Sequence, residues 1–259
     1  MIGLFDSGLG GLTVLARLRE RMPAADMMFF ADQAHVPYGD RTHAELLRLL
    51  RANLARFDEC GVDAIVMACN TSCAIAERYG WPVTRAHVLD LIDSAATAIQ
   101  RAGHKRIGVV ATAATVAAGS YGRTLRSAVP GAEVWEIAAP ALVPLVEAGK
   151  TSGGEPRKAV EAVCNDLPRD LDAVIYGCTH YPLLEEHFSA ALGPSVKLID
   201  PAVMQAERAA ALLAAQEPNG DTGQTRYVTS GDAALFKTNV ARIMNEANPN
   251  VASITLAST

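Results

Sequence analysis

Two cysteines stand at the ends of two similar stretches of this 259-residue chain. Cys69 ends Val62-Asp-Ala-Ile-Val-Met-Ala-Cys, and Cys178 ends Leu171-Asp-Ala-Val-Ile-Tyr-Gly-Cys, 109 positions further along. A thiolate is a competent base when its neighbours bring its pKa near the working pH. Two thiols on opposite sides of one carbon could remove a proton from one face and deliver a proton to the other. The pair therefore predicts an enzyme that inverts a stereocentre.

The residues after each cysteine could hold an anionic substrate. Asn70 and Thr71 follow the first cysteine, and Thr179 and His180 follow the second. Small polar residues at a helix start can cap the helix or bind a carboxylate, and the amide dipoles there favour an anion. A cysteine after a strand can instead be a small buried apolar residue, and a lone histidine usually has a structural role. The matching contexts of the two cysteines favour the functional interpretation.

A glycine-rich turn near the start of the chain is a further polar cluster. Asp6 and Ser7 follow an apolar run and lead into Gly8-Leu-Gly-Gly11. Such a turn at a helix N-terminus suits an anion, while Asp6 could hold an ammonium group. The turn lacks the lysine of a phosphate loop and the third spaced glycine of a dinucleotide fingerprint, so a nucleotide site is not expected.

Other candidates have weaker signals. Pro37-Tyr38-Gly39 follows a predicted strand and offers backbone N–H groups at Tyr38 and Gly39, although the same residues could form an ordinary turn. Glu147, like His180, is a titratable group near a predicted loop, and a lone glutamate is usually a solvated helix residue. Only the pattern of the whole chain supports these positions as site residues.

The sequence repeats itself beyond the cysteines. Ile2-Gly-Leu-Phe matches Ile107-Gly-Val-Val, and Leu91-Ile-Asp-Ser-Ala matches Leu198-Ile-Asp-Pro-Ala, in the same order as the cysteine stretches. Three ordered matches indicate two similar halves. Thr112 and Thr115 lie where the repeat places the counterpart of the Asp-Ser pair near the N-terminus.

Short apolar runs alternate with longer amphipathic stretches, which predicts parallel sheets with helices on both faces. The predicted strands are Met1–Phe5, Met27–Ala31, Ala64–Ala68, Val88–Ile92, Ile107–Ala111, Glu133–Ala138, Ala173–Tyr176 and Val196–Ile199. The predicted helices are Gly11–Arg21, Arg41–Cys60, Ser72–Tyr79, Ser94–Ala102, Ala118–Val129, Leu142–Ala148, Arg157–Asp166, Leu183–Leu192 and Ala202–Gln216. Ligands of such sheets bind beyond the carboxyl ends of the strands, where both cysteines stand.

We therefore expect an α/β protein of two similar three-layer domains with mainly parallel sheets, related by a pseudo-twofold axis. The first domain should comprise residues 1–95 and 205–259, and the second residues 96–204. This symmetry would place Cys69 and Cys178 opposite one another in the cleft between the domains.

Composition excludes several other classes of function. The formal net charge is −5, whereas a nucleic-acid binder needs a basic face. No apolar run approaches the ~20 residues of a membrane span, and no basic stretch of a secretory signal follows Met1. Five irregularly spaced cysteines fit reduced thiols in a cytosol. Cys69 and Cys73 could share a helical face, but no second Cys or His pair has zinc-site spacing, so no metal is expected.

Together these motifs resemble those of the bacterial glutamate racemases. The similar segments are Asp6-Ser-Gly-Leu-Gly-Gly-Leu12, Pro37-Tyr38-Gly39, Ala68-Cys-Asn-Thr71, Val143-Pro-Leu-Val-Glu147, Gly177-Cys-Thr-His-Tyr-Pro182 and Leu198-Ile-Asp-Pro201. They occur in the order and spacing of that family, and the resemblance runs from residue 2 to about residue 232.

The resemblance implies interconversion of L- and D-glutamate without pyridoxal phosphate, metal or nucleotide, supplying D-glutamate for peptidoglycan in the cytoplasm. Cys178 would deprotonate the L isomer and Cys69 the D isomer, with Asp6, Glu147 and His180 assisting the thiols. The implied substrate contacts are Asp6, Ser7, Pro37, Tyr38, Gly39, Asn70, Thr71, Thr112, Thr115, Thr179 and His180. The expected partner is glutamate, with a homodimer as one assembly and with neither nucleic acid nor membrane.

Three alternatives stay open at this point. Asp93-Ser94 and Ala139-Pro140 depart from the family's usual Pro-Gly and Cys-Pro pairs, so an aspartate racemase or another superfamily member is one alternative, although Pro37-Tyr38-Gly39 favours glutamate. A thiol hydrolase could use the second cysteine with His180, which would leave the first cysteine idle. A non-catalytic amino-acid-binding protein on the same scaffold is the third.

Overall fold

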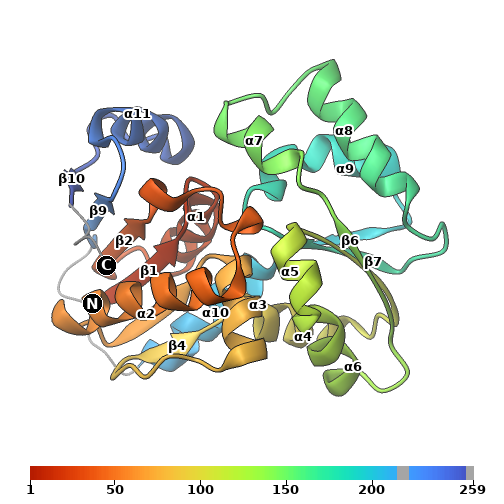
Figure 1. Ribbon diagram of the computed structural model, residues 1–259, viewed down its shortest axis with the longest axis horizontal. Coiled ribbons are helices and arrows are strands. Elements are labelled where there is room, and N and C mark those ends of the chain that lie inside the picture. Colours follow the sequence, from red (N-terminus) through yellow and green to blue (C-terminus); the bar gives the residue numbers. More distant parts are fainter. Residues whose placement is uncertain (215–221, 255–259) are drawn as a thin grey trace.

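The fold is built on two parallel sheets. The computed structural model describes residues 1–214 and 222–254. The first sheet has the strand order β10-β9-β2-β1-β3-β4 and the second β6-β5-β7-β8, and every strand pairing is parallel (Figure 1). The strands are β1 (Ile2–Asp6), β2 (Met27–Ala31), β3 (Ala64–Met67), β4 (His87–Leu89), β5 (Arg106–Ala111), β6 (Glu133–Ala138), β7 (Ala173–Gly177), β8 (Lys197–Ile199), β9 (Thr225–Thr229) and β10 (Val251–Ser253).

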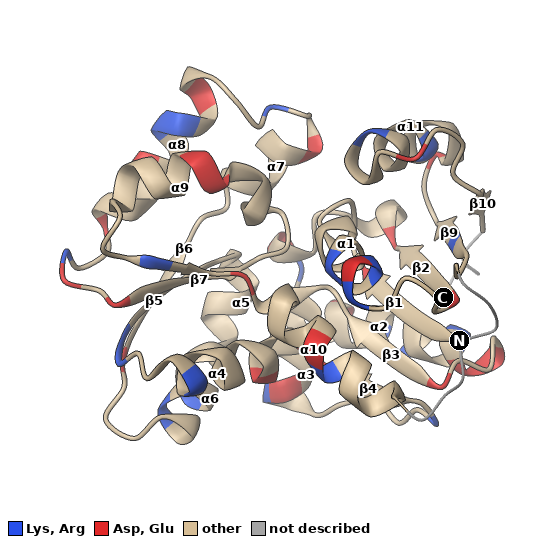
Figure 2. Ribbon diagram, turned by 180° about the vertical axis from the view of Figure 1, so that it is seen from behind, with Lys and Arg blue, Asp and Glu red and all other residues tan. Residues whose placement is uncertain are grey.

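Helices cover the sheets. They are α1 (Gly11–Arg21), α2 (His43–Glu59), α3 (Asn70–Tyr79), α4 (Leu91–Ala102), α5 (Ala113–Ala118), α6 (Ser120–Ala128), α7 (Leu142–Glu147), α8 (Gly154–Asn165), α9 (Glu185–Leu192), α10 (Pro201–Leu213) and α11 (Ala233–Met244), with short 3-10 helices η1 (Gln33–His35), η2 (Tyr38–Asp40) and η3 (Tyr181–Leu184). Helices α8 and α9 lie on one face of the second sheet, and α4 and α6 on the other (Figures 1 and 2). Every residue of β1, β2, β3 and β7 is buried, as a sheet covered on both faces requires. The expected α/β class with parallel sheets is confirmed.

The strand register brings the post-strand residues together. In the first sheet Phe5 pairs with Met67, so the residues after β1 and β3 leave the sheet at the same edge. In the second sheet Ala111 pairs with Gly177, so the residues after β5 and β7 do the same. These two edges carry the predicted polar positions.

The last described stretch of the chain joins the first sheet. β9 pairs with β2, and β10 pairs with β9. Neither these strands nor α11 was predicted from the sequence. The expected domain boundaries, 95/96 and 204/205, fall inside α4 and α10, two helices that pack against one another. The division into domains stays a prediction.

Some predicted element limits were wrong for local reasons. The helix predicted over Ala118–Val129 begins two residues later, at Ser120, because Gly119 adopts a left-handed conformation with φ 64°, and Ala118 ends the unpredicted helix α5. The strand predicted over Val88–Ile92 ends at Leu89, since the Asp90 carboxylate accepts hydrogen bonds from the first amides of α4. The helix predicted to reach Gln216 ends at Leu213, and Gln216 itself lies outside the described residues.

Candidate active site

One pocket takes its lining from the edges of both sheets. Among the residues found there are Cys69 from the end of β3 and Cys178 from the end of β7, both nearly buried. The predicted site residues that line it are Asp6, Ser7, Pro37, Tyr38, Gly39, Cys69, Asn70, Thr71, Thr112, Cys178, Thr179 and His180. Thr115 and Glu147 do not line the pocket but contact residues that do.

Cys178 is joined to a histidine and, through it, to a carboxylate. The Sγ atom of Cys178 lies 3.5 Å from Nδ1 of His180. The other ring nitrogen, Nε2, lies 2.6 Å from Oε1 of Glu147. Glu147 also accepts a hydrogen bond from the Leu9 amide at 3.1 Å. The three side chains form a relay from the pocket to α7.

The relay favours a cation at His180. Burial alone would lower the pKa of this imidazole, but the neighbouring Cys178 and Glu147 raise it well above its usual value. Burial would raise the pKa of Glu147, yet the hydrogen bond and charge of His180 hold it below its usual value. The imidazolium–carboxylate pair thus places a positively charged ring nitrogen 3.5 Å from the Cys178 sulfur.

Cys69 has the opposite environment. It is the N-cap residue of α3, and its thiol donates to the Ser7 hydroxyl at 3.6 Å. Burial, and secondly the negative charge of Asp6, raise the pKa of Cys69 to about 11. This cysteine therefore rests as a thiol. The site holds one thiol suited to donate a proton and one sulfur suited to accept a proton.

Asp6 links the two halves at the base of the pocket. Its carboxylate accepts a hydrogen bond from the Gly8 amide at 2.7 Å and from the Thr179 hydroxyl at 3.3 Å. Burial raises its pKa, although the charge of His180 opposes the rise. Asp6 comes from β1 and Thr179 follows β7, so this contact fixes one sheet edge against the other.

The glycines of the turn after β1 leave room for this relay. A Cβ atom on Gly10 would lie 2.5 Å from Nδ1 of His180 and from Oγ1 of Thr179, and one on Gly8 would lie 2.6 Å from Oε1 of Glu147. Real Cβ atoms do not approach other heavy atoms so closely. The glycines are thus explained by the close approach of the His180, Thr179 and Glu147 side chains, a role the sequence pattern did not reveal.

Three threonines form a hydroxyl cluster on the other side of the site. Thr71 and Thr112 lie 2.9 Å apart between their Oγ1 atoms, Thr112 and Thr115 also 2.9 Å, and Thr115 donates to Thr71 at 3.3 Å. Thr71 belongs to α3, whereas Thr112 and Thr115 follow β5. Closely spaced hydroxyls that line a pocket can donate to a carboxylate.

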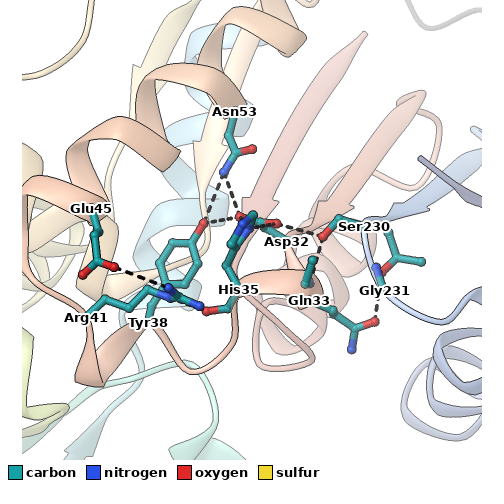
Figure 3. Close-up of polar contacts among 11 residues, drawn as sticks. Asp32, Gln33, His35, Tyr38, Arg41, Glu45, Asn53, Ser230 and Gly231 are labelled. Carbon is teal, nitrogen blue, oxygen red and sulfur yellow. Dashed lines mark hydrogen bonds and ion pairs between the residues drawn. The ribbon is translucent and has the colours of Figure 1, made fainter. Parts of the chain in front are cut away.

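The loop with Tyr38 is held by a buried carboxylate that was not predicted. Asp32 is fully buried and accepts from the Tyr38 hydroxyl at 2.5 Å, from Ser230 at 2.8 Å and from Asn53 at 3.4 Å, with His35 Nδ1 at 2.9 Å (Figure 3). Ser230 lies beyond β9, so the C-terminal stretch contributes to the support of the pocket loop. A polar residue directly after a predicted strand was the available sequence signal.

Sequence analysis missed several apolar and peripheral lining residues. They are Val36, Asp40, Ala113, Pro140, Val143 and Pro144. Five of them are apolar and carry no chemical signal, whereas the Asp40 carboxylate directly follows the predicted Pro37-Tyr38-Gly39 segment.

Outside this pocket, the described residues show neither a metal site nor a membrane-spanning helix. Lys and Arg are mixed with Asp and Glu along the outer helices (Figure 2). Within residues 1–214 and 222–254, no three His, Cys, Asp or Glu side chains are placed to hold a metal ion. None of the helices described there is long and apolar enough to cross a bilayer.

A pocket with one cysteine from each of two parallel α/β sheets is the arrangement expected of a racemase with two acid/base groups. The sequence profile of Asp/Glu/Hydantoin racemases matches residues 13–209. The chain therefore belongs to the aspartate/glutamate/hydantoin racemase family.

The individual proteins and structures that are similar to this chain include several glutamate racemases. The chain is 43% identical over 237 residues to the glutamate racemase of Gloeobacter violaceus, covering 91% of this chain and 89% of that protein. The crystal structure of Thermus thermophilus glutamate racemase with β-chloro-D-alanine matches with a TM-score of 0.85 at 35% identity, over 98% of this chain and 96% of the other. The structure of the Francisella tularensis enzyme with D-glutamate matches with a TM-score of 0.91 at 27% identity, over 100% and 98%.

Proposed function

We propose that this protein is a glutamate racemase that interconverts L- and D-glutamate with two cysteines as its acid/base groups, supplying D-glutamate for peptidoglycan. The observation that carries the proposal is the placement of one cysteine from each sheet in one pocket, Cys69 beside a carboxylate and Cys178 beside a histidine. The names of the relatives support the substrate.

The unlike surroundings of the sulfurs set the direction of the first proton transfer. The Cys178 thiolate, stabilised by His180, takes the α-proton of L-glutamate, and the Cys69 thiol delivers its proton to the opposite face. D-glutamate leaves, with Cys178 protonated and Cys69 as the thiolate. Starting from D-glutamate, that second state runs the same steps in reverse, so no proton is gained or lost overall.

The polar lining fits an amino acid with two carboxylates. The Thr71–Thr112 hydroxyl cluster and Asn70 supply hydrogen-bond donors for carboxylates, and Asp6 supplies a negative charge for the ammonium group. Ser7 accepts a hydrogen bond from the Cys69 thiol, and Thr179 donates one to the Asp6 carboxylate. The remaining predicted contacts, Pro37, Tyr38, Gly39 and His180, shape the pocket around the substrate, with Thr115 acting through the hydroxyl cluster.

The direct test is loss of the α-hydrogen of L-glutamate in deuterated water, followed by mass spectrometry and chiral chromatography on protein purified without added cofactor. We expect solvent deuterium at the α-carbon of D-glutamate and an equilibrium near equal amounts of both enantiomers. L-aspartate, assayed in parallel, tests the aspartate alternative. Tight glutamate binding without exchange would instead support a binding protein, and a trapped acyl-enzyme at Cys178 a thiol hydrolase.

The setting of the enzyme is also part of the proposal. We infer a cytoplasmic protein, because five cysteines without a disulfide pattern suit a reducing compartment. The division into domains of 1–95 with 205–259 and of 96–204 follows the sequence repeat, and a homodimer is the assembly proposed. The net charge of −5 argues against nucleic acid as a partner.

A further inference from the structure

The first turn of α6 is hydrogen-bonded to α3, the helix that follows Cys69. The Ser120 hydroxyl donates to the carbonyl oxygen of Ala74 at 2.7 Å, and Arg123 forms an ion pair with Glu77 at 2.6 Å. Helix α6 follows a strand of the second sheet, whereas α3 follows a strand of the first. These contacts therefore hold one side of the active site against the other.

A third contact between α6 and α3 reaches a residue of the pocket. The Tyr121 hydroxyl donates to Oδ1 of Asn70 at 2.5 Å. Tyr121 is fully buried, and burial raises the pKa of its phenol well above the usual value, so the hydroxyl keeps its proton and acts as the donor. Tyr121 itself does not line the pocket, whereas Asn70 does.

This bond leaves the other end of the Asn70 amide unused. The Nδ2 atom is buried and has no hydrogen-bond partner among the described residues. A buried donor without an acceptor is unfavourable, so a ligand that supplies an acceptor binds more tightly. Carboxylate oxygens are strong acceptors for such a donor.

We propose that Tyr121 is a positioning residue of the active site, which holds the Asn70 side chain so that its Nδ2 donates to a carboxylate of the substrate. The inference rests on the proposed function, because it takes an amino-acid substrate as given. The two ends of a carboxamide have nearly the same shape, so only hydrogen bonds decide which end faces the ligand. Without the tyrosine hydroxyl the amide can turn over and present its oxygen to the anionic substrate, which repels it.

The test is a double-mutant cycle with Tyr121→Phe and Asn70→Ala, measuring kcat and KM for both glutamate enantiomers. We expect Tyr121→Phe to raise KM about 10-fold in both directions, with kcat changed less than about threefold, since the lost contact is to bound substrate. We expect the double variant to match Asn70→Ala alone, because Tyr121 acts through Asn70. Tyr227→Phe is the matched control: Tyr227 is equally buried, its hydroxyl donates to Glu246 at 2.8 Å, and it lies outside the pocket.

Additive effects in the cycle, or an unchanged KM in Tyr121→Phe, would overturn the inference. If Tyr121→Phe does not fold, Asn70→Asp gives a second test, because it keeps an acceptor for Tyr121 and replaces only the Nδ2 donor. We expect its KM to rise at least 100-fold, and an unchanged KM would also overturn the inference. An inactive wild-type protein would instead contradict the proposed function, so the two failures are distinguishable.

Discussion

Glu147 Oε1 lies 2.6 Å from His180 Nε2, and this contact, with that of Cys178, extends the pH range over which His180 keeps its positive charge. The carboxylate is one of the groups that raise the pKa of His180 above its usual value. The positive charge beside Cys178 is present below that raised pKa and is lost above it. Glu147 thus contacts His180 without lining the pocket.

Replacing Glu147 by Gln should therefore move the alkaline limb of kcat/KM to lower pH. The neutral amide keeps the shape of the side chain but removes the charge that favours the imidazolium. We expect kcat/KM at pH 8 to fall at least about 10-fold, with a smaller loss at pH 6. A pH profile of racemisation measures this. Glu161→Gln is the control, because Glu161 pairs with Arg157 on an exposed surface, and an unshifted limb in Glu147→Gln would contradict the relay.

The two cysteines should be separable by half-reactions. Cys69→Ser and Cys178→Ser should each lose racemisation by roughly 10³-fold or more, because the two thiols act as a unit. With an analogue that eliminates a leaving group after loss of the α-proton, only one base is needed. Cys69→Ser should still process the L form, and Cys178→Ser the D form. Elimination assays with both enantiomers measure this, with Cys60→Ser, at an exposed cysteine, as control. Equal loss of both eliminations in each variant would contradict a two-base mechanism.

Adding one methyl group at Gly10 should damage catalysis more than stability. Its Cβ would meet His180 and Thr179, so the imidazole must move away from Cys178. We expect Gly10→Ala to lower kcat about 100-fold, since small displacements of catalytic groups are costly. Steady-state kinetics and a thermal melt measure the two effects. Gly154→Ala is the control, because open space surrounds that position, and wild-type kcat in Gly10→Ala would contradict the packing argument.

The hydrogen bonds that Asp32 accepts from Tyr38 and Ser230 should make both stability and substrate binding depend on the C-terminal stretch. Asp32→Asn replaces an acceptor by a donor in a buried cluster, so we expect a loss of about 2 kcal/mol in the free energy of unfolding and a raised KM through Tyr38. Ser230→Ala removes the hydrogen bond to Asp32 and the one that Ser230 accepts from the Ala34 amide, and should cost about 1–2 kcal/mol. Urea denaturation measures both. Thr238→Ala, at an exposed helix position, should change the free energy by less than about 0.5 kcal/mol. Equal stabilities of Ser230→Ala and wild type would show that the serine link is unimportant.

Sequence alone was sufficient for the repeated α/β pattern and for the two cysteines, because both depend on local order along the chain. The polar residues after β1, β3, β5 and β7 were also predicted, since parallel strands bring their carboxyl ends to one edge. The sequence alone was insufficient to predict the role of Tyr121, because its hydrogen bond to Asn70 depends on the helix break at Gly119. The same holds for Asp32, because one of its partners, Ser230, is almost 200 residues away in the sequence.

The position of β9 beside β2 has a consequence for synthesis on the ribosome. β2 is Met-Met-Phe-Phe-Ala, and all of its residues are buried in the finished protein. The edge of β2 that faces away from β1 pairs with β9, residues 225–229, which are translated after the whole second sheet. Until then a nascent chain presents an apolar strand with unpaired backbone groups, the kind of edge that promotes aggregation. Residues 225–229 therefore cover this edge of β2 late in synthesis. A nascent chain that stalls before residue 225 leaves the edge open for a chaperone or another nascent chain to bind.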